Sequence, residues 1–236
     1  METVEIKIYE SIREIPLRKY QEYLAIANNL DAVKDRETLD QAALKIFCEI
    51  PLEQIRATPL KSFNGLLGRL SEAFKTKPQF EPRFLMVGTD DVAVEFGCIP
   101  NLDNMSYGEY KDLESYFSSW DTMHKALAVL YRPIIKEDKH GRYLIEPYEG
   151  SEKYSEILKD APLAVALGVE VFFYHLGTRL RNFTMDSILK ENNEQFQQTL
   201  NQVSERNGVD IHHSLNSLTE TLLNLNRQVR FHYTQP

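Results

Sequence analysis

A stripe of large apolar side chains runs through the middle of this chain at helical spacing. Between residues 107 and 130, such a residue recurs every three or four positions. The members of the stripe are Tyr107, Tyr110, Leu113, Phe117, Trp120, Met123, Leu127 and Leu130. This spacing places all of them on one face of an α-helix. A single unbroken helix here would be on the order of 35 Å long at 1.5 Å per residue.

The flanking residues indicate where this helix begins and ends. Ser106 and Glu109 have the S-x-x-E spacing of a capping box, which predicts a helix start, and Pro133 is expected to end the helix. Ser118, Ser119 and Asp121 can divide it, because such side chains compete for backbone hydrogen bonds. One long helix and two shorter ones both remain open.

The first third of the chain predicts one strand followed by a small helical subdomain. Residues 4–9 read V-E-I-K-I-Y, and this alternation is typical of a half-buried strand. Helical spacing follows over 17–30, where Pro16 suits a first helical turn. It continues over 39–47, where Asp35 or Thr38 would cap a helix, and then over 52–58 and 61–74.

Two hairpins and an apolar helix are predicted after residue 75. The segment KTKPQFEPR, with two prolines, is typical of a linker. Residues 84–87 and 92–96 are β-rich runs joined by Gly-Thr-Asp-Asp, and 134–136 and 143–145 flank a second turn. A short helix is expected from Ser151. The strongly apolar segment that begins at Asp160 and Pro162 is expected to be a core helix.

The composition changes at about Phe183. The following residues are rich in Gln and Asn, and a helix with so few apolar residues is marginally stable alone. A leucine seam then repeats at spacings of three and four residues, as in a short coiled coil. We expect this part to need a partner, either its own chain or another subunit. The seam consists of Leu215, Leu218, Leu222 and Leu225.

The predicted fold class is α+β and predominantly α-helical, with helical bundle-like segments, two short β-hairpins and an N-terminal strand. Three parts are expected. Residues 1–80 would form the strand and the small helical subdomain, and 81–183 would form the hairpin and core-helix subdomain. Residues 184–236 would form a helical extension or oligomer arm.

Composition excludes several broad classes of function. The net charge of −8 argues against a general nucleic-acid binder, which needs a basic face to displace counterions. No apolar run reaches the length of a membrane span, so we expect no membrane partner. The two cysteines, Cys48 and Cys98, are far apart, which favours neither a disulfide framework nor a zinc site.

No motif in the sequence predicts catalysis, a metal site or a cofactor. The carboxylates near the central stripe fit the solvated face of a helix better than a Mg²⁺ site; they are Asp103, Glu109, Asp112, Glu114 and Asp121. A hairpin set could suggest a metal-dependent nuclease, but Gly97 stands where its lysine would be expected; the set is Asp90, Asp91 and Glu95. Asp210, His212 and His213 have a D-x-H-H pattern, but adjacent histidines diverge on a helix or strand.

The candidate partner-binding residues come from the stripe and from the seam. Trp, Tyr and Met are over-used at protein interfaces. The alternative for the stripe is ordinary core packing, and both interpretations remain open. The candidates are Tyr110, Phe117, Trp120, Met123, Leu215, Leu218, Leu222 and Leu225.

Several stretches resemble a family of tailed-bacteriophage proteins that occur in tail-morphogenesis gene neighbourhoods and are similar to tail assembly chaperones. The most specific is W-x-x-M-H-K-A-x-A-V-L-Y-R-P, from Trp120 to Pro133. It lies in IPNLDNMSYGEYKDLESYFSSWDTMHKALAVLYRPI. Further matching stretches are IREIPLRKYQEYLAI with FCEIPLEQIRATPLKSF, then YLIEPYEGSEKYSEILKDAPLAVALGVEVFFYHLG and, more loosely, SERNGVDIHHSLNSLTETLLNL. Together they cover most of the chain.

The resemblance implies a morphogenesis protein of the tail or neck module, not an enzyme. It carries over no catalytic residues. Its expected partners are other phage tail, neck or portal proteins, together with further copies of the chain in an oligomer or ring. The expected location is the host cytoplasm during assembly, or the virion tail or neck. A transient chaperone and a permanent head–tail connector or neck subunit both remain open.

Overall fold

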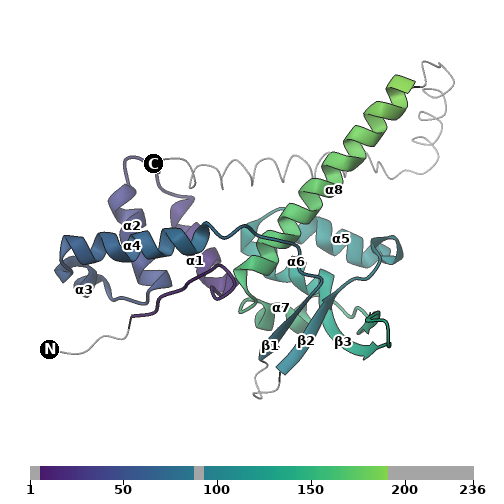
Figure 1. The fold of residues 1–236 in the computed structure, drawn as a ribbon, viewed down its shortest axis with the longest axis horizontal. Helices are drawn as coiled ribbons and strands as arrows, with labels where there is room; N and C mark the ends of the chain where they lie inside the picture. Colours follow the sequence, from purple (N-terminus) through teal and green to yellow (C-terminus); the bar gives the residue numbers. More distant parts are fainter. Residues whose placement is uncertain (1–5, 88–92, 191–236) are drawn as a thin grey trace. The chain divides into compact units, whose positions relative to one another are not determined.

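The computed structural model describes residues 6–87 and 93–190, and the side chains up to residue 179. The chain divides into two compact units, Met1–Val169 and Glu170–Pro236, and each is considered by itself. The sequence predicts three parts, with boundaries near residues 80 and 183. Those boundaries stay predictions. The described residues form eight α-helices and one four-stranded antiparallel sheet, which confirms the predicted α+β, mainly helical class (Figure 1).

Four helices form the first part of the larger unit. They are α1 (Leu17–Ala27), α2 (Arg36–Phe47), α3 (Leu52–Ala57) and α4 (Leu60–Phe74). The apolar spacing predicts their inner faces correctly, since Leu17, Tyr20 and Leu24 of α1 are all buried. Between α2, α3 and α4 a small core forms from Leu44, Cys48, Ile50 and Ile55, with Phe63, Leu66 and Leu67 packed against it.

The predicted N-terminal strand is wrong for its described residues. Residues 6–9 are not paired in a sheet, although the Lys7 N–H donates to the Cys48 carbonyl at 3.2 Å. Ile6 and Ile8 are 43% and 42% exposed, so the alternation of apolar and polar residues does not mark a buried and an exposed face here. Alternation predicts a strand only where a second strand is available for pairing. Residues 4 and 5 lie outside the described residues.

Both predicted hairpins are confirmed, and together they make the sheet. Its order is β1-β2-β3-β4, and every neighbouring pair is antiparallel. The strands are β1 (Arg83–Val87), β2 (Ala93–Cys98), β3 (Tyr131–Glu137) and β4 (Tyr143–Ile145). Pro133 therefore lies within β3 and does not end the preceding helix, which stops at Leu130. The turn between β1 and β2 lies outside the described residues.

The central stripe is divided between two helices, α5 (Tyr107–Tyr116) and α6 (Met123–Leu130). The capping box is present at the start of α5, where the Ser106 hydroxyl accepts the Glu109 N–H. The division falls at Ser119, whose side chain accepts the Asp121 N–H and begins a short 3-10 turn, η2 (Trp120–Thr122). The Thr122 hydroxyl donates to the Tyr116 carbonyl at 2.6 Å. These local hydrogen bonds replace helical ones, as the sequence allows.

Two segments from opposite ends of the larger unit are joined by main-chain hydrogen bonds. The N–H groups of Leu17 and Arg18 donate to the carbonyls of Ala161 and Lys159 at 2.9 and 2.7 Å. In return, the N–H groups of Leu163 and Ala164 donate to the carbonyls of Ile15 and Ile12 at 2.8 and 3.1 Å. We refer to this contact between residues 12–18 and 159–164 of the same chain as the long-range pairing.

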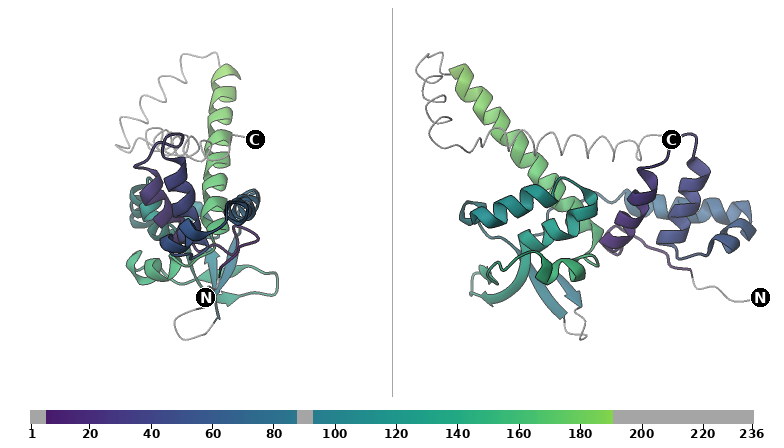
Figure 2. Two further views of the ribbon diagram at one scale, coloured as in Figure 1. Left: turned by 90° about the vertical axis from the view of Figure 1, so that its left-hand side faces the viewer. Right: turned by 180° about the vertical axis from the view of Figure 1, so that it is seen from behind.

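The positions of the last two helices are predicted correctly, but only the first part of the apolar helix is buried: residues 163–170 are buried and 171–179 are partly or fully exposed. α7 (Glu152–Leu158) begins after Ser151, and α8 (Leu163–Lys190) is the predicted apolar helix (Figure 2). From Leu163 to Val169 every residue of α8 is buried. Within the described residues, no helix combines the length and apolarity needed to cross a membrane.

Two helical glycines provide a matched test of this packing. A Cβ on Gly168 would lie 2.2 Å from the Gln79 carbonyl oxygen, whereas one on Gly65 would meet nothing within 4 Å. Gly168→Ala should therefore destabilise the protein, because the chain at Gln79 must move. Gly65→Ala should stabilise it by about 0.5–1 kcal/mol, because alanine is the better helix former. Thermal unfolding of both variants would show opposite shifts, and equal shifts would contradict the packing.

Candidate functional site

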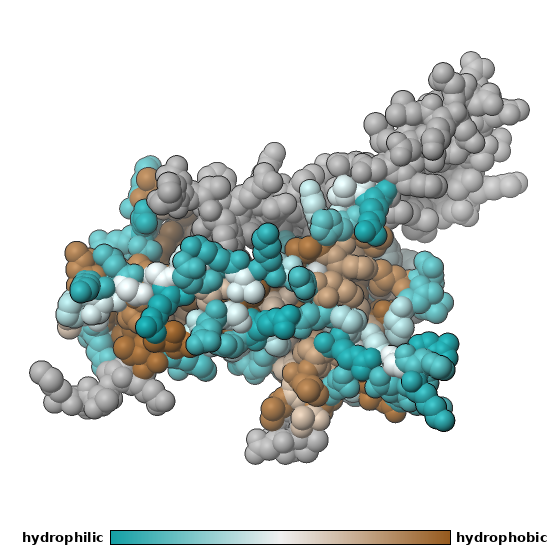
Figure 3. Space-filling view, viewed as in Figure 1, coloured by the Kyte–Doolittle hydropathy of each residue, from teal (hydrophilic) through white to brown (hydrophobic). Residues whose placement is uncertain are grey.

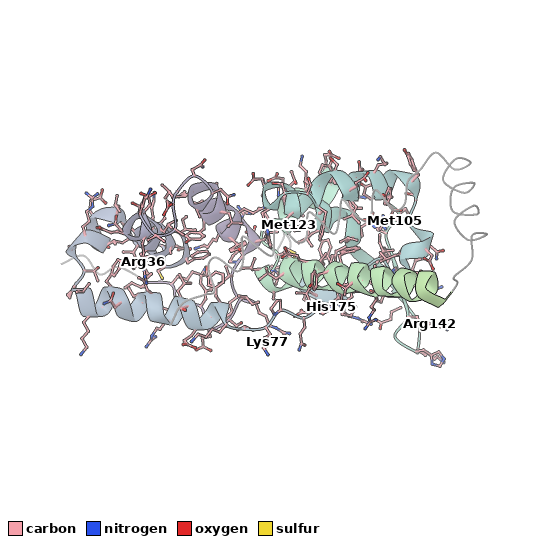
Figure 4. All side chains as sticks on the ribbon, turned by 90° about the horizontal axis from the view of Figure 1, so that it is seen from above. Arg36, Lys77, Met105, Met123, Arg142 and His175 are labelled. Carbon is pink, nitrogen blue, oxygen red and sulfur yellow. The ribbon has the colours of Figure 1, made fainter. Side chains whose placement is uncertain are left out.

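The aromatic stripe lies mostly in the interior. Phe117, Trp120 and Met123 are only 1%, 4% and 0% exposed, while Tyr110 is half-buried. Buried side chains cannot contact a partner unless the fold opens, so core packing is what the structure shows for these three. Met123 begins α6 (Figure 4). Of the stripe candidates, only Tyr110 keeps a surface that a partner can reach.

Trp120 connects the central stripe to the first helix. Its ring meets the Tyr20 ring edge-on, with centroids 4.9 Å apart. The side-chain amide of Gln21 donates to the Trp120 carbonyl at 2.6 Å and lies 3.1 Å from His124 Nδ1. An amide nitrogen can only donate, so His124 Nδ1 is the acceptor and the ring is neutral. This assignment follows from the hydrogen-bond network.

A buried ion pair joins α5 to the sheet. Arg132 Nη1 lies 2.7 Å from Glu109 Oε1, and both side chains are less than 10% exposed. Arg132 also lies over the ring of Tyr148, whose hydroxyl donates to Asp112 Oδ2 at 2.6 Å. Burial alone would raise the pKa of Glu109, but hydrogen bonds from Ser106 and the Arg132 charge outweigh it and lower the pKa.

This ion pair was missed from the sequence. The sequence places Glu109 in the helix cap and on the solvated face of the helix, and Arg132 only in the run that carries the family resemblance. The solvated face is wrong for Glu109, which is 7% exposed because it pairs with the buried Arg132. A charged residue within the otherwise apolar A-V-L-Y-R-P run was the available signal, because arginine is rarely buried without a partner. Which carboxylate serves as that partner depends on the tertiary fold.

The carboxylates near the stripe are engaged separately and do not converge on one point. Glu109 pairs with Arg132, Asp112 accepts from Tyr148, and Glu114 pairs with Lys111. In residues 6–87 and 93–190, no group of His, Cys, Asp and Glu is arranged to hold a metal ion. Glu95 lies 3.4 Å from Arg83. Asp90 and Asp91, the other members of the hairpin set, lie outside the described residues.

The three histidines among the described residues lie on separate elements. His124 is buried in α6, His140 is exposed in the turn after β3, and His175 is exposed on α8 (Figure 4). Burial raises the pKa of Cys98 to about 12, so its thiol stays protonated and unreactive. Asp210, His212 and His213 lie outside the described residues, as do Leu215, Leu218, Leu222 and Leu225.

Two open grooves lie on the larger unit. One has a volume of about 340 Å³ and lies between the sheet and α7, where Met86, Phe96 and Ile157 form part of its wall. The other, about 560 Å³, lies beside α4 and includes Ile6, Ile8 and Leu66. The first groove is lined mainly by apolar side chains, so a protein segment suits it better than a small polar substrate. The lining of the second is mixed, with Gln54, Thr58, Ser62 and Arg69 beside its apolar residues.

The exposed apolar side chains mark a surface that sequence reasoning did not identify. Leu85 and Val87 on β1 are 67% and 66% exposed, and Figure 3 shows apolar atoms gathered on the β1–β2 hairpin. Their neighbours Phe84 and Met86 are buried. Alternation of apolar and polar residues predicts the two faces of a strand. Residues 84–87 are all apolar, so the sequence does not indicate which face is exposed to solvent.

Breaking the buried ion pair should destabilise the fold. Glu109→Ala leaves the Arg132 charge uncompensated in the interior, which typically costs about 3–5 kcal/mol. The double variant Glu109→Leu with Arg132→Met should recover much of this loss, because neither charge then remains buried. Urea unfolding measures both effects. A double variant no more stable than Glu109→Ala would contradict the account.

His124 should make stability depend on pH. Burial first, and then the nearby charges of Lys159 and Lys125, lower its pKa below 6.5, while Glu156 opposes them. The unfolded chain therefore takes up this proton first, so the contribution is complete above pH 6.5 and is lost as the pH falls through the folded pKa. Thermal midpoints from about pH 7 to about pH 5 should fall more for the natural protein than for His124→Gln. Parallel profiles would contradict this.

The sequence was compared with protein-family models, with curated proteins and with solved structures, and none of the three comparisons found a match.

Proposed function

We propose that this chain is a non-enzymatic morphogenesis protein of the tail or neck module of a tailed bacteriophage. It acts by binding other proteins during virion assembly, in the manner of a tail assembly chaperone. Its partners are other tail, neck or portal proteins and further copies of itself.

The observation that carries the proposal is the family resemblance over Trp120 to Pro133. This run contains all of α6 and the start of β3. Trp120, Met123 and Tyr131 are at most 4% exposed, and Arg132 forms the buried ion pair. The resemblance therefore concerns residues that determine the interior, where a shared pattern reflects a shared fold.

The surface of the described residues suits protein binding. Large apolar side chains are exposed on separate elements, including Leu60 on α4, Leu85 on β1 and Leu144 on β4. Single exposed apolar residues are ordinary, but Leu85 and Val87 are neighbours on one face of β1. The opposite face of the sheet borders an apolar groove, with Met86 and Phe96 in its wall. Such surfaces are covered during assembly by partner subunits.

The test is mass spectrometry of purified virions beside lysate of infected cells, with the copy number per particle. Presence in lysate and absence from virions is the result expected of a chaperone. A fixed copy number, such as about a dozen for a ring at the portal axis, would assign the chain to a permanent neck or connector protein. Deletion of the gene should abolish assembled tails. Normal tails without the protein would overturn the proposal.

The leucine seam provides a second test. Leu218→Asp with Leu222→Asp should abolish binding to a partner, because burying unpaired charge at an apolar contact is costly. The fold of residues 6–87 and 93–190 should stay intact. Co-purification from infected cells measures the binding, and thermal unfolding measures the fold. Loss of cooperative unfolding would show that the seam packs within its own chain.

A further inference from the structure

The two edges of the sheet differ in how they are protected. β4 is only three residues long, and its register with β3 shifts between Ile134 and Lys136. Short strands and irregular registers are the usual means of preventing an edge from pairing with another chain. β1, at the opposite edge (Figure 1), is five residues long and pairs with β2 in unbroken register.

The residues of β1 itself provide little further protection. From Phe84 to Val87 it contains no charge and no proline. Its one charged residue, Arg83, is engaged by Glu95 at 3.4 Å and by Glu137 at 3.1 Å. A long, apolar, regular edge strand of this kind is a template for strand addition.

The hydrogen-bond pattern shows which backbone groups of β1 face outward. The Cys98 N–H donates to the Pro82 carbonyl at 2.8 Å, so residues 82 and 98 form a hydrogen-bonded pair. Such pairs alternate along an antiparallel ladder. Phe84 and Met86 therefore bond to β2, and the N–H and C=O groups of Arg83, Leu85 and Val87 point away from it. Among the described residues, β1 pairs with β2 alone.

We propose that β1 pairs antiparallel with β1 of a second copy, across a two-fold axis at Leu85. Leu85 then lies opposite Leu85 of the second copy, and Arg83 lies opposite Val87. Arg83, Leu85 and Val87 are the residues whose N–H and C=O groups point away from β2. This register gives each of these groups a hydrogen-bond partner in the second copy. The two sheets become one continuous sheet.

The self-complementary register favours a second copy as the occupant, because the outward main-chain groups of residues 83, 85 and 87 in one copy meet the same set in the other. The net charge of −8 opposes self-association in general, so the contact needs an edge that adds little repulsion. Glu95, the residue of β2 across from Leu85, is already paired with Arg83. Residues 83–87 contain no acidic side chain, and in the proposed register no two like charges face each other. The Leu85 and Val87 side chains of both copies would also lie next to one another and form one apolar surface. These side chains are now about two-thirds exposed, and the contact would shield part of them from water.

The N-terminal segment of the same chain is a weaker alternative. Its residues alternate like a strand, but the Lys7 N–H is already bonded to the Cys48 carbonyl at 3.2 Å. The proposal deepens one part of the proposed function, the binding of further copies of the chain. A monomer at every concentration would remove that part and leave the proposed binding to other tail or neck proteins standing. Failure of the phage assignment would leave the dimer standing, because sedimentation concerns the purified chain alone.

The test is the mass of the full chain in solution, measured by sedimentation over a range of concentrations. The natural protein should form a dimer. Leu85→Lys places two like charges opposite each other at the axis and should return the protein to a monomer. Its thermal midpoint should equal that of the natural protein diluted to the concentrations at which it is monomeric, because dimerisation itself raises the midpoint. The matched control is Leu144→Lys, on the protected edge and 57% exposed, which should remain a dimer.

A second variant tests the hydrogen bonds themselves. Leu85→Pro removes an N–H that points away from β2, so it should spare the β1–β2 hairpin while weakening the dimer by about ten- to a hundredfold. Hydrogen exchange at Leu85 and Val87 should slow as the protein concentration rises.

Three results would overturn the proposal. The first is a natural protein that stays monomeric at every concentration. The second is a Leu85→Lys dimer as tight as the natural one. The third is protection of the Leu85 amide that is independent of concentration, which would show that another segment of the same chain covers the edge.

Discussion

The long-range pairing is the interaction on which the rest of the larger unit depends. It joins residues 12–18 to 159–164, so everything between them is enclosed in one loop of the chain. Ile12, Ile15, Leu17, Ala161 and Leu163 are all at most 1% exposed, so these main-chain hydrogen bonds lie in a dry interior. A buried peptide group without a partner is costly, and each segment provides the partners for the other. Sequence-distant contacts of this kind carry an entropic cost of closure, which the surrounding apolar burial offsets.

The predictions succeeded where local pattern and tertiary structure agree. The capping box at Ser106, the two hairpins and the helices up to residue 75 follow from spacing and turn residues alone. They failed where a longer-range partner decides the outcome. Residues 6–9 alternate like a strand but have no neighbouring strand among the described residues. The spacing of the central stripe fits one helix or two, and the local hydrogen bonds of Ser119 and Thr122 decide for two, as the sequence allows.

The candidate site could be only partly predicted, for a physical reason. Helical spacing shows that Phe117, Trp120 and Met123 share a face, but it does not show whether that face meets the core or a partner. Burial decides for the core. The features that single out β1 are its place at the edge of the sheet and the direction of its amides. Neither is written in the residues F-L-M-V, because both depend on which strands lie beside it. The proposed dimer contact therefore uses an edge strand with exposed apolar side chains, while Phe117 and Trp120 pack in the interior.

Hydrogen exchange at the long-range pairing tests this account most directly. The amides of Leu17, Arg18, Leu163 and Ala164 should be among the slowest to exchange, at a rate set by global unfolding, because opening the pairing exposes the interior of the larger unit. Rapid exchange at these four amides, while the β1–β2 and β2–β3 pairs stay protected, would contradict it. That result would show that the segments at the two ends of the unit are accessory to a fold that stands without them.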